Sequence, residues 1–378
     1  MQNEEKKSFH FPAAGLIALF VVGLWGCLLI YAARAMSASP EFFVWKQMAW
    51  LAAGCLGFAG SAAIPFPWFL KYRNTLFRIT LAALILVLIF GEKMRGMTGW
   101  FVLPGPIFFQ PSEFAKPIFI LLLAATSADR SFSTERKRFL YQILVSASFC
   151  LLILAEPDFG SASLFYLGML TVLWLQGTPP RFLIPAVLAA PAGAGLFLYL
   201  KPYAFDRILS FLNPGSDSYR GAWHIRQIQY ALAEGGWTGS EHGAALWSNA
   251  YLPLPHSDSL FASIVETSGL MGGLIVLLSF SAASFGMILL ARRERLRPEA
   301  SIYVEGIAFL YLAQALLHIS MNVVLLPPTG VTLPLLSYGG SSLCSTMIAL
   351  GTAFSAFRSG RSNEDATTPP KTSVRPEE

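Results

Sequence analysis

The chain has 378 residues, of which 54% are hydrophobic and only 13% carry a charge, with a formal net charge of +5. Soluble globular domains have about 25% charged residues, so this composition excludes that class. The charges cluster between apolar stretches of about 20 residues, the length that crosses a bilayer. Because most of the positive charge lies in these connections, where it sets membrane orientation, we expect an integral membrane protein and no nucleic-acid partner.

Ten apolar stretches predict an all-α integral membrane protein of about ten transmembrane helices with one long extracytoplasmic loop. The spans are expected at residues 13–35, 43–65, 75–91, 114–128, 140–155, 160–177, 182–200, 260–291, 302–325 and 338–357. The first has no small-residue cleavage pattern, which favours a retained helix over a signal peptide. The eighth is long enough to tilt in the bilayer or to extend beyond it.

The distribution of Lys and Arg predicts the orientation of the chain. An even number of spans leaves both termini on one side, and the segments on that side hold 18 of the 27 Lys and Arg residues. By the positive-inside rule both termini are then cytoplasmic. Residues 201–259 become the long external loop of a transmembrane domain that covers residues 1–358. The polar residues 359–378 are predicted to form a disordered cytoplasmic tail.

Polar stretches marked by Gly or Pro fall on the external side, at residues 99–116, 156–160, 201–259 and 327–342. The internal loops hold charges and ordinary turn residues. This one-sided pattern predicts a site that opens to the external space. No ATP is available there, so nucleotide-driven chemistry is disfavoured.

The first of these stretches carries Trp100, Glu113 and Lys116. Glu113 follows Pro111 and Ser112 in an ordinary helix start, so it is either a helix-start residue or a functional carboxylate. Lys116 lies one turn further into the membrane, where ionisable groups are costly and mark functional sites, with Glu113 as its partner at i−3. Trp100 is either an interfacial anchor or part of the site.

The second stretch, AEPDFGSA, brings Glu156 and Asp158 to the start of the sixth span. Asp158 is suited to cap the helix that follows. Two carboxylates so close together at the mouth of a membrane cavity also leave a catalytic or ion-binding role open.

The external loop predicts an amphipathic helix over residues 219–233 that lies along the membrane surface. Apolar residues recur there at helical spacing, and polar residues occupy the other faces. Four external cations run against the positive-inside rule, namely Lys201, Arg207, Arg220 and Arg226. Each is either a solvated surface charge or a ligand for an anionic head group.

Asp258 lies where this loop re-enters the membrane, in the sequence LPLPHSDSLFA. It is either the N-cap of the eighth span or a functional carboxylate. A metal site made by His224, His242 and His256 is disfavoured, because spacings of 18 and 14 residues match no tight ligand motif.

The last stretch, PPTGVTLPLLSYGGSS, contains two breaks, at residues 327–330 and 339–340. They predict unwound backbone at membrane depth, which is tolerated only where protein or a water-filled cavity covers it. We therefore expect this segment, including Ser337, to form a second wall of the same cavity.

In these blocks the sequence resembles the SEDS family (shape, elongation, division and sporulation), whose members include RodA and FtsW. The resemblance covers about residues 12 to 358 and is strongest in FQPSEFAK, EPDFGSA, LPLPHSDSLFA and PPTGVTLPLLSYGGSS. It implies a multi-pass protein of the bacterial cytoplasmic (inner) membrane. It also implies a peptidoglycan glycosyltransferase that polymerises lipid II, the undecaprenyl-pyrophosphate-linked disaccharide, into β-1,4 glycan strands at the outer face. The implied partners are a class B penicillin-binding protein transpeptidase and membrane lipids.

By the same resemblance Asp258 is the essential aspartate, and we expect it to act as general base toward a sugar hydroxyl. The residues expected to contact the substrate are Trp100, Glu113, Lys116, Asp158, Arg207, Arg220, Arg226, Gln227, His256 and Ser337. The pattern predicts no metal site and demands no cofactor, while a need for a divalent cation (Mg²⁺ or Mn²⁺) stays open.

The chain departs from the family pattern around Asp258. Leu254 replaces a glutamate, Ser257 a threonine and Ser259 a phenylalanine, and Thr267 stands where a second glutamate is common. These departures leave lowered activity open, together with two other functions. One is a transporter that flips lipid II and needs no base. The other is a non-catalytic scaffold that activates the partner transpeptidase.

Overall fold

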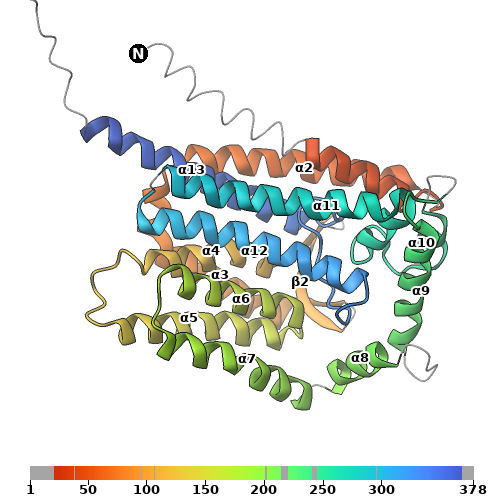
Figure 1. Ribbon diagram of the computed structural model, residues 1–378, viewed down its shortest axis with the longest axis horizontal. Coiled ribbons are helices and arrows are strands. Elements are labelled where there is room, and N and C mark those ends of the chain that lie inside the picture. Colours follow the sequence, from red (N-terminus) through yellow and green to blue (C-terminus); the bar gives the residue numbers. More distant parts are fainter. Residues whose placement is uncertain are drawn as a thin grey trace, which may run out of the picture.

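The computed structural model describes residues 21–37, 39–94, 96–105, 107–200, 202–213, 220–240, 245–294 and 296–367. Its long helices run side by side in one bundle (Figure 1). They are Val21–Ala32 of the first span, α2 (Pro40–Ala63), α3 (Phe66–Phe90), α4 (Pro111–Ala125), α5 (Glu135–Ala155), α6 (Phe159–Leu175), α7 (Pro180–Leu200), α11 (Leu260–Arg293), α12 (Pro298–Asn322) and α13 (Gly340–Thr367). Each predicted span overlaps one of these helices, which confirms a multi-pass helical membrane fold.

The helices differ in how much of their apolar surface the bundle covers. Within the described residues, six are long and apolar enough to cross a membrane: α2, α3, α5, α11, α12 and α13. In the most apolar window of α12, 78% of the residues are buried, against 17% in α3 and in α11. Apolar surface exposed on that scale faces lipid rather than water. Helix α12 is therefore central, while α3 and α11 are peripheral.

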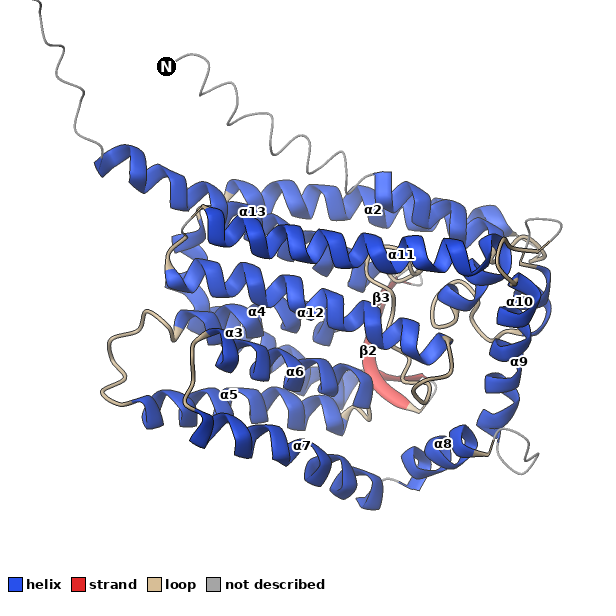
Figure 2. Ribbon diagram, in the orientation of Figure 1, coloured by secondary structure: helices blue, strands red, loops and turns tan. Residues whose placement is uncertain are grey.

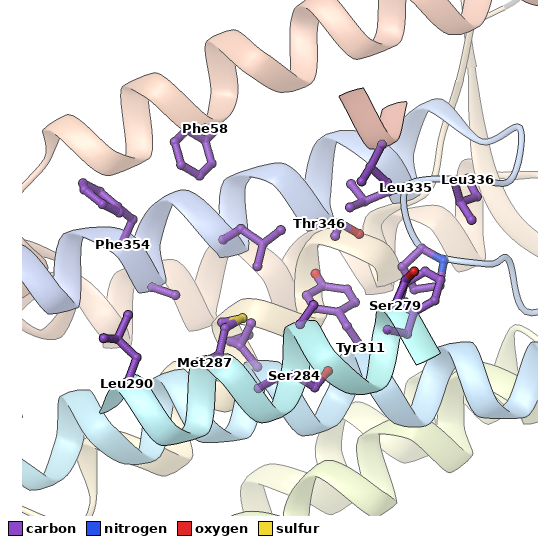
Figure 3. Close-up of a pocket in the computed structure, with 18 of the residues that line it drawn as sticks. Phe58, Ser279, Ser284, Met287, Leu290, Tyr311, Leu335, Leu336, Thr346 and Phe354 are labelled. Atoms are coloured by element: carbon purple, nitrogen blue, oxygen red, sulfur yellow. The ribbon is translucent and has the colours of Figure 1, made fainter. Parts of the chain in front are cut away.

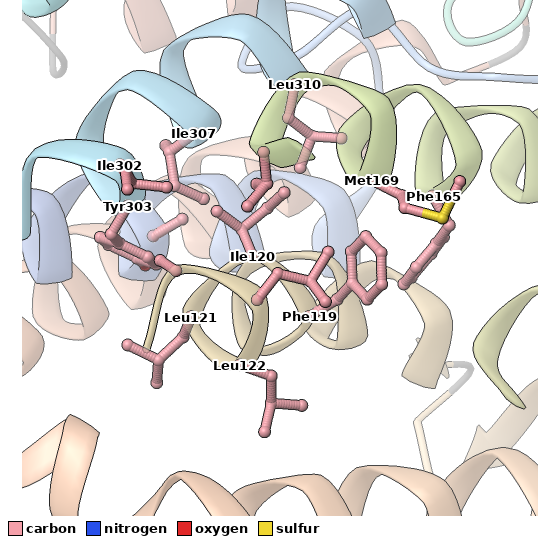
Figure 4. Packing of buried hydrophobic residues seen from close by; sticks show 14 of the residues in the cluster. Phe119, Ile120, Leu121, Leu122, Phe165, Met169, Ile302, Tyr303, Ile307 and Leu310 are labelled. Carbon is pink, nitrogen blue, oxygen red and sulfur yellow. The ribbon is translucent and has the colours of Figure 1, made fainter. Parts of the chain in front are cut away.

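The core packs α4, α5, α6 and α12 around buried aromatic rings (Figure 4). The ring centroids of Phe119, Phe149 and Phe165 lie 5.0 to 5.4 Å apart, a range in which aromatic pairs attract. Gly306 lets α12 approach α4 closely, since a Cβ there would lie 2.8 Å from the side chain of Ile120. Close packing of this kind holds helices together in a bilayer, where the hydrophobic effect between them is absent.

Residues 92–109 form a small antiparallel sheet, so the all-α prediction is wrong for this segment (Figure 2). Strands β1 (Glu92–Met94), β2 (Met97–Leu103) and β3 (Ile107–Phe109) pair in the order β1-β2-β3. Gly96 (φ 86°) and Gly105 (φ 84°) adopt the left-handed backbone conformation that tight turns use. The strands are too short for a clear period-2 pattern to stand out in the sequence.

Helix α11 is broken at Gly269, where φ is 68° and ψ is −177°. The backbone N–H groups of Leu270 and Met271 donate instead to the carbonyls of Gly236 and Trp237, at 2.9 and 3.2 Å. Unsatisfied backbone groups are not tolerated inside a bilayer. The turn after the preceding external helix therefore supplies the acceptors that the broken helix lacks. The long eighth span predicted from the sequence contains this break.

The external loop contributes three short helices, α8 (Pro202–Leu212), α9 (Arg220–Gly235) and α10 (Leu246–Tyr251). They lie at the same end of the bundle as the sheet (Figure 1). Helix α9 confirms the helix predicted for residues 219–233. At the other end, α13 continues to Thr367, so the beginning of the segment predicted to be disordered is helical. Residues 368–378 of that predicted tail lie outside the described residues.

Candidate active site

A polar cavity of about 290 Å³ lies at the end of the bundle that holds the sheet. Its walls come from the start of α2, the sheet, the starts of α4 and α6, the segment before α11, and the segment between α12 and α13. Five of the predicted contact and catalytic residues line it, namely Trp100, Glu113, Asp158, His256 and Asp258. Polar stretches that lie far apart in the sequence therefore meet in one cavity.

Asp258 is half-buried and lines the cavity next to His256 and Ser257. In one of its two interpretations Asp258 caps α11, but the N-cap position of α11 is Ser259, and it makes no side-chain capping bond. The hydroxyl of Ser257 donates to Asp258 Oδ1 at 3.2 Å. The capping interpretation of Asp258 is therefore wrong, and its carboxylate faces a cavity instead of a helix end.

The segment just before α11 is fixed by the loop between α12 and α13. The hydroxyl of Ser337 donates to the carbonyl of Ser257 at 2.9 Å, and the N–H of Tyr338 donates to the carbonyl of His256 at 2.9 Å. Leu254, at φ 53°, adopts a left-handed conformation that branched residues rarely take. Such strain persists only where the surroundings hold the backbone in place, and these hydrogen bonds do so.

Glu113 and Lys116 form the predicted ion pair, with Lys116 Nζ 2.7 Å from Glu113 Oε1. The ammonium of Lys116, whose side chain is 1% exposed, also donates to Gln314 Oε1 at 2.9 Å. The amide nitrogen of Gln314 donates in turn to the carbonyl of Thr332 at 3.0 Å. Glu113 lines the cavity and Lys116 lies one turn deeper, so the pair ties α4 to α12 directly below the site.

Asp158 is the N-cap of α6, as one of its two interpretations predicted. The backbone N–H and the hydroxyl of Ser161 donate to its two carboxylate oxygens at 2.9 and 2.6 Å. The same carboxylate lines the cavity. Capping therefore fixes the orientation of an acidic group that also contributes to the site.

Glu156 is a fully buried carboxyl group, and neither of its oxygens has a hydrogen-bond partner among the described residues. Its backbone carbonyl accepts from Thr98 N–H at 3.3 Å, and its Oε2 lies 3.0 Å from where a Cβ on Gly99 would stand. Burial, with a smaller contribution from the charge of Asp158, raises the pKa of Glu156 to about 9. Glu156 is therefore protonated at neutral pH, against the strand that carries Trp100.

Three further predicted contact residues differ in their positions relative to the cavity. His256 lines the cavity and packs against Phe43 and Tyr338, with ring centroids 5.0 and 5.2 Å away. Ser337 and Gln227 are buried and are not part of the cavity lining. Since the hydroxyl of Ser337 binds backbone groups, the prediction that it contacts substrate is corrected to a role in holding the loop.

Of the three predicted external arginines, only Arg226 has a side chain that the structure describes. Arg226, on α9, is half-buried and lies outside the cavity lining. The side chains of Arg207 and Arg220 lie outside the described residues.

The start of α2 contributes Lys46 and Trp50 to the cavity, which the sequence analysis missed. The ammonium of Lys46 lies 5.6 and 6.0 Å from the ring centroids of Phe42 and Phe108. The signal was present, because Lys46 is an ionisable residue inside an apolar span, the feature that singled out Lys116.

The metal site considered for the external loop involved His224, His242 and His256. Among the described residues, no group of three His, Cys, Asp or Glu side chains gathers as a metal site. His224 exchanges a hydrogen bond with the hydroxyl of Ser259 at 3.1 Å, and His242 lies outside the described residues.

A second cavity of about 520 Å³ lies between α2, α11, α12 and α13 (Figure 3). Its walls are mostly apolar and include Phe58, Met287, Leu290 and Phe354. Residues 334–336 form one wall, and the neighbouring residues of the same loop line the polar cavity. The loop between α12 and α13 therefore borders both cavities.

Comparison with known proteins agrees with this geometry. The chain matches the model of a cell cycle protein family, FtsW, RodA and SpoVE, over residues 9–361. The chain belongs to this family. This confirms the SEDS resemblance over nearly the whole described bundle.

Individual SEDS proteins are similar over most of their length. The chain is 31% identical over 346 residues to the probable peptidoglycan glycosyltransferase FtsW of Alcanivorax borkumensis, covering 89% of each chain. It is 32% identical over 342 residues to the probable peptidoglycan glycosyltransferase FtsW of Nitrosococcus halophilus, covering 88% of each chain.

Solved structures of SEDS proteins share the fold. One structure, which describes the coordination of polymerization and crosslinking by a peptidoglycan synthase complex, contains a similar chain. The TM-score is 0.77 at 27% identity, covering 92% of this chain and 97% of that one. RodA of Thermus thermophilus has the same fold, with a TM-score of 0.67 at 24% identity, covering 91% of this chain and 96% of its own.

Proposed function

We propose that this SEDS protein is a peptidoglycan glycosyltransferase that polymerises lipid II. The observation that carries the proposal is the carboxylate of Asp258, which lines a polar cavity at one end of a membrane bundle and caps no helix. The names of the similar FtsW proteins support the same reaction class. The neighbouring Trp100, Glu113, Asp158 and His256 give the cavity polar and aromatic walls suited to a sugar.

The proposed reaction is a single displacement at the anomeric carbon of one lipid-linked sugar. The 4-hydroxyl of a second sugar attacks that carbon, and Asp258 accepts the hydroxyl proton as the new C–O bond forms. The bond from the anomeric carbon to the phosphate oxygen breaks, and undecaprenyl pyrophosphate leaves with the bonding electrons. An alcohol is a poor nucleophile at neutral pH, so a base in contact with it is worth about 10²- to 10⁴-fold in rate. Inversion at the carbon converts an α-linked donor into a β-1,4 product.

The diphosphate carries two negative charges in lipid II and gains a third as the C–O bond breaks, so its departure needs cationic stabilisation. Lys116 was expected to contact the substrate, but its ammonium is engaged with Glu113 and Gln314 below the cavity. Lys46 lines the cavity itself. We therefore assign contact with the pyrophosphate to Lys46 and support of the cavity wall to Lys116.

The proposal places the cavity on the outer face of the bacterial cytoplasmic membrane, with both termini in the cytoplasm. The excess of Lys and Arg in the opposite loops supports this orientation. A class B penicillin-binding protein is the proposed partner, because polymerisation and crosslinking are coordinated in the complex that contains the similar chain.

A polymerisation assay with purified protein and lipid II tests the proposal. Asp258→Asn keeps the shape of the side chain and removes the base, so we expect glycan synthesis to fall by about 10²-fold or more. The matched control is Asp129→Asn, which removes a carboxylate paired with Arg73 at 2.9 Å, outside the cavity. Each variant is measured alone and with the partner transpeptidase. Wild-type synthesis by Asp258→Asn would contradict the assignment.

The apolar cavity favours one rival, a transporter that carries the lipid chain of lipid II across the membrane. Its walls between α2, α11 and α13 are suited to a polyprenyl chain. A transporter needs no base. This alternative therefore predicts that Asp258→Asn moves lipid II across the membrane of proteoliposomes at the wild-type rate, and that neither the wild type nor the variant makes glycan. The scaffold alternative predicts that the purified protein makes no glycan and that no cavity substitution changes its activation of the partner transpeptidase.

A further inference from the structure

Asn322, the last residue of α12, is buried next to the segment that carries Asp258. Its amide nitrogen donates to the backbone carbonyl of Asp258 at 3.0 Å and to the carbonyl of His318 at 2.9 Å. Its amide oxygen accepts from the backbone N–H of Ala262 at 3.2 Å. One side chain thus joins the end of α12, the start of α11 and the backbone of the proposed base.

The two backbone groups that Asn322 binds across the interface are related by helix geometry. In an α-helix the N–H of each residue donates to the carbonyl four residues earlier, so a helix extended back by one turn would pair Ala262 N–H with the carbonyl of Asp258. The amide of Asn322 replaces this bond: its oxygen accepts from Ala262 N–H, and its nitrogen donates to the Asp258 carbonyl. It satisfies an N–H of the first turn, which has no acceptor within its own helix, and it binds the Asp258 carbonyl outside the helix.

This arrangement explains why Asp258 does not act as a helix cap. Helix α11 begins at Leu260 with no side-chain cap from Ser259, because the capping function comes from Asn322 on a different helix. Asp258 is left in the non-helical segment that lines the cavity. The loop between α12 and α13 holds the other side of this segment through Ser337 and Tyr338.

We propose that Asn322 is a positioning residue for the glycosyl transfer, acting through Asp258 by inserting its amide between the Asp258 carbonyl and Ala262 N–H. The inference rests on the proposed function. Both halves of the amide are required: a carboxylate at this position would accept from Ala262 but present an oxygen to the Asp258 carbonyl. An aliphatic side chain of similar size would bind neither group.

The test uses Asn322→Asp and Asn322→Leu in the full-length protein with lipid II. We expect kcat to fall by about 10²-fold in both, the effect of a displacement of about 1 Å in a catalytic group, with KM little changed. Asn322→Asp has the same shape as the native residue, so it decides the outcome if Asn322→Leu does not fold. The matched control is Asn249→Leu, since Asn249 also bridges segments with three hydrogen bonds but none to Asp258.

A double-variant comparison separates positioning from general stability. In an Asp258→Asn background the base is already absent, so Asn322→Asp is expected to reduce kcat by less than about twofold, because residues that act as a unit are not additive. Losses that multiply in the double variant, or wild-type kcat in both single variants, would overturn the role of Asn322. If Asp258→Asn itself kept the wild-type rate, the proposed function would fail, and this outcome is distinct from either of the others.

Discussion

At the residue scale, the acids in and beside the cavity differ in how they are held. Glu113 is paired with Lys116 at 2.7 Å, Asp158 is bound by the N–H and hydroxyl of Ser161, and Glu156 is buried with no hydrogen bond to either oxygen among the described residues. These surroundings fix three of the acids structurally. Asp258 lines the cavity too; it is neither a helix N-cap like Asp158 nor paired with Lys116 like Glu113.

Glu156→Gln is predicted to stabilise the protein increasingly as the pH rises. The pKa of Glu156 is raised from 4.5 to about 9. Between these values the unfolded state binds fewer protons than the folded state, so the stability of the wild type falls as pH increases. Glutamine keeps the shape and does not titrate. We expect the gain in thermal midpoint over wild type, measured in detergent, to be larger at pH 8 than at pH 5. An equal gain at both pH values would contradict the conclusion that Glu156 is buried in its protonated form.

Lys116→Met is predicted to destabilise the fold by about 3–5 kcal/mol, because it leaves the Glu113 carboxylate buried without its partner. Adding Glu113→Gln to this variant should recover most of the loss. The control is Arg181→Met, which breaks an exposed pair with Glu135 at 3.4 Å and should cost less than about 1 kcal/mol. Thermal unfolding of the three purified variants and the wild type measures these differences. Equal losses in the two single variants would show that the Lys116 pair is not structural.

At the element scale, the break in α11 depends on the external loop. The carbonyls of Gly236 and Trp237 accept from the N–H groups released at Gly269. Three residues earlier, the carboxylate of Glu266 accepts from the backbone N–H groups of Trp247 and Ser248, at 2.6 and 2.8 Å. The part of α11 from Glu266 to Met271 therefore binds both α10 and the turn after α9. Helix α10 leads directly into the segment that carries Asp258.

Gly269→Ala is predicted to loosen this junction. A Cβ at residue 269 would overlap the backbone of Trp237, and the left-handed φ of 68° disfavours any side chain. We expect a cost of about 1–3 kcal/mol and faster hydrogen exchange at the amides of Leu270 and Met271. Gly286→Ala, where no atom lies within 4 Å of the added Cβ, should leave both amides protected. Unchanged exchange in Gly269→Ala would contradict the conclusion that the external loop supplies the acceptors for these two amides.

The sequence predicted the membrane helices well because each is a long apolar run between charged turns. It predicted helix α9 from helical spacing of apolar residues. It could not predict the sheet, whose strands of three to seven residues carry no clear period. Nor could it predict the break at Gly269, because glycine is common inside membrane helices and the acceptors for Leu270 and Met271 lie more than thirty residues away in the chain.

At the scale of the whole molecule, the polar stretches that the charge count assigns to one side of the membrane all contribute residues to one cavity. Grouping them by side therefore predicted which parts of the chain meet, while the side itself stays a prediction. The finer composition of the cavity needed the tertiary structure: a lone Lys46 in an apolar span does not by itself show that it faces the cavity, and Asn322 reaches Asp258 from 64 positions away.

The orientation predicts which side of the membrane each loop faces. In a protein without Cys27, Cys55, Cys150 and Cys344, single cysteines are introduced as Tyr251→Cys and Arg130→Cys, both at exposed positions. A membrane-impermeant maleimide added to spheroplasts should label the cysteine at residue 251 and not the one at residue 130. After lysis both should react. The reverse pattern would put the cavity on the cytoplasmic side, where lipid II polymerisation does not serve the cell wall.

The most direct measurement is the single-turnover rate of glycan bond formation from lipid II by Asp258→Asn relative to the wild type, at saturating substrate. The account predicts a fall of about 10²-fold or more at neutral pH, with both proteins equally folded by thermal midpoint. Equal rates would mean that the carboxylate at residue 258 takes no proton from the attacking sugar.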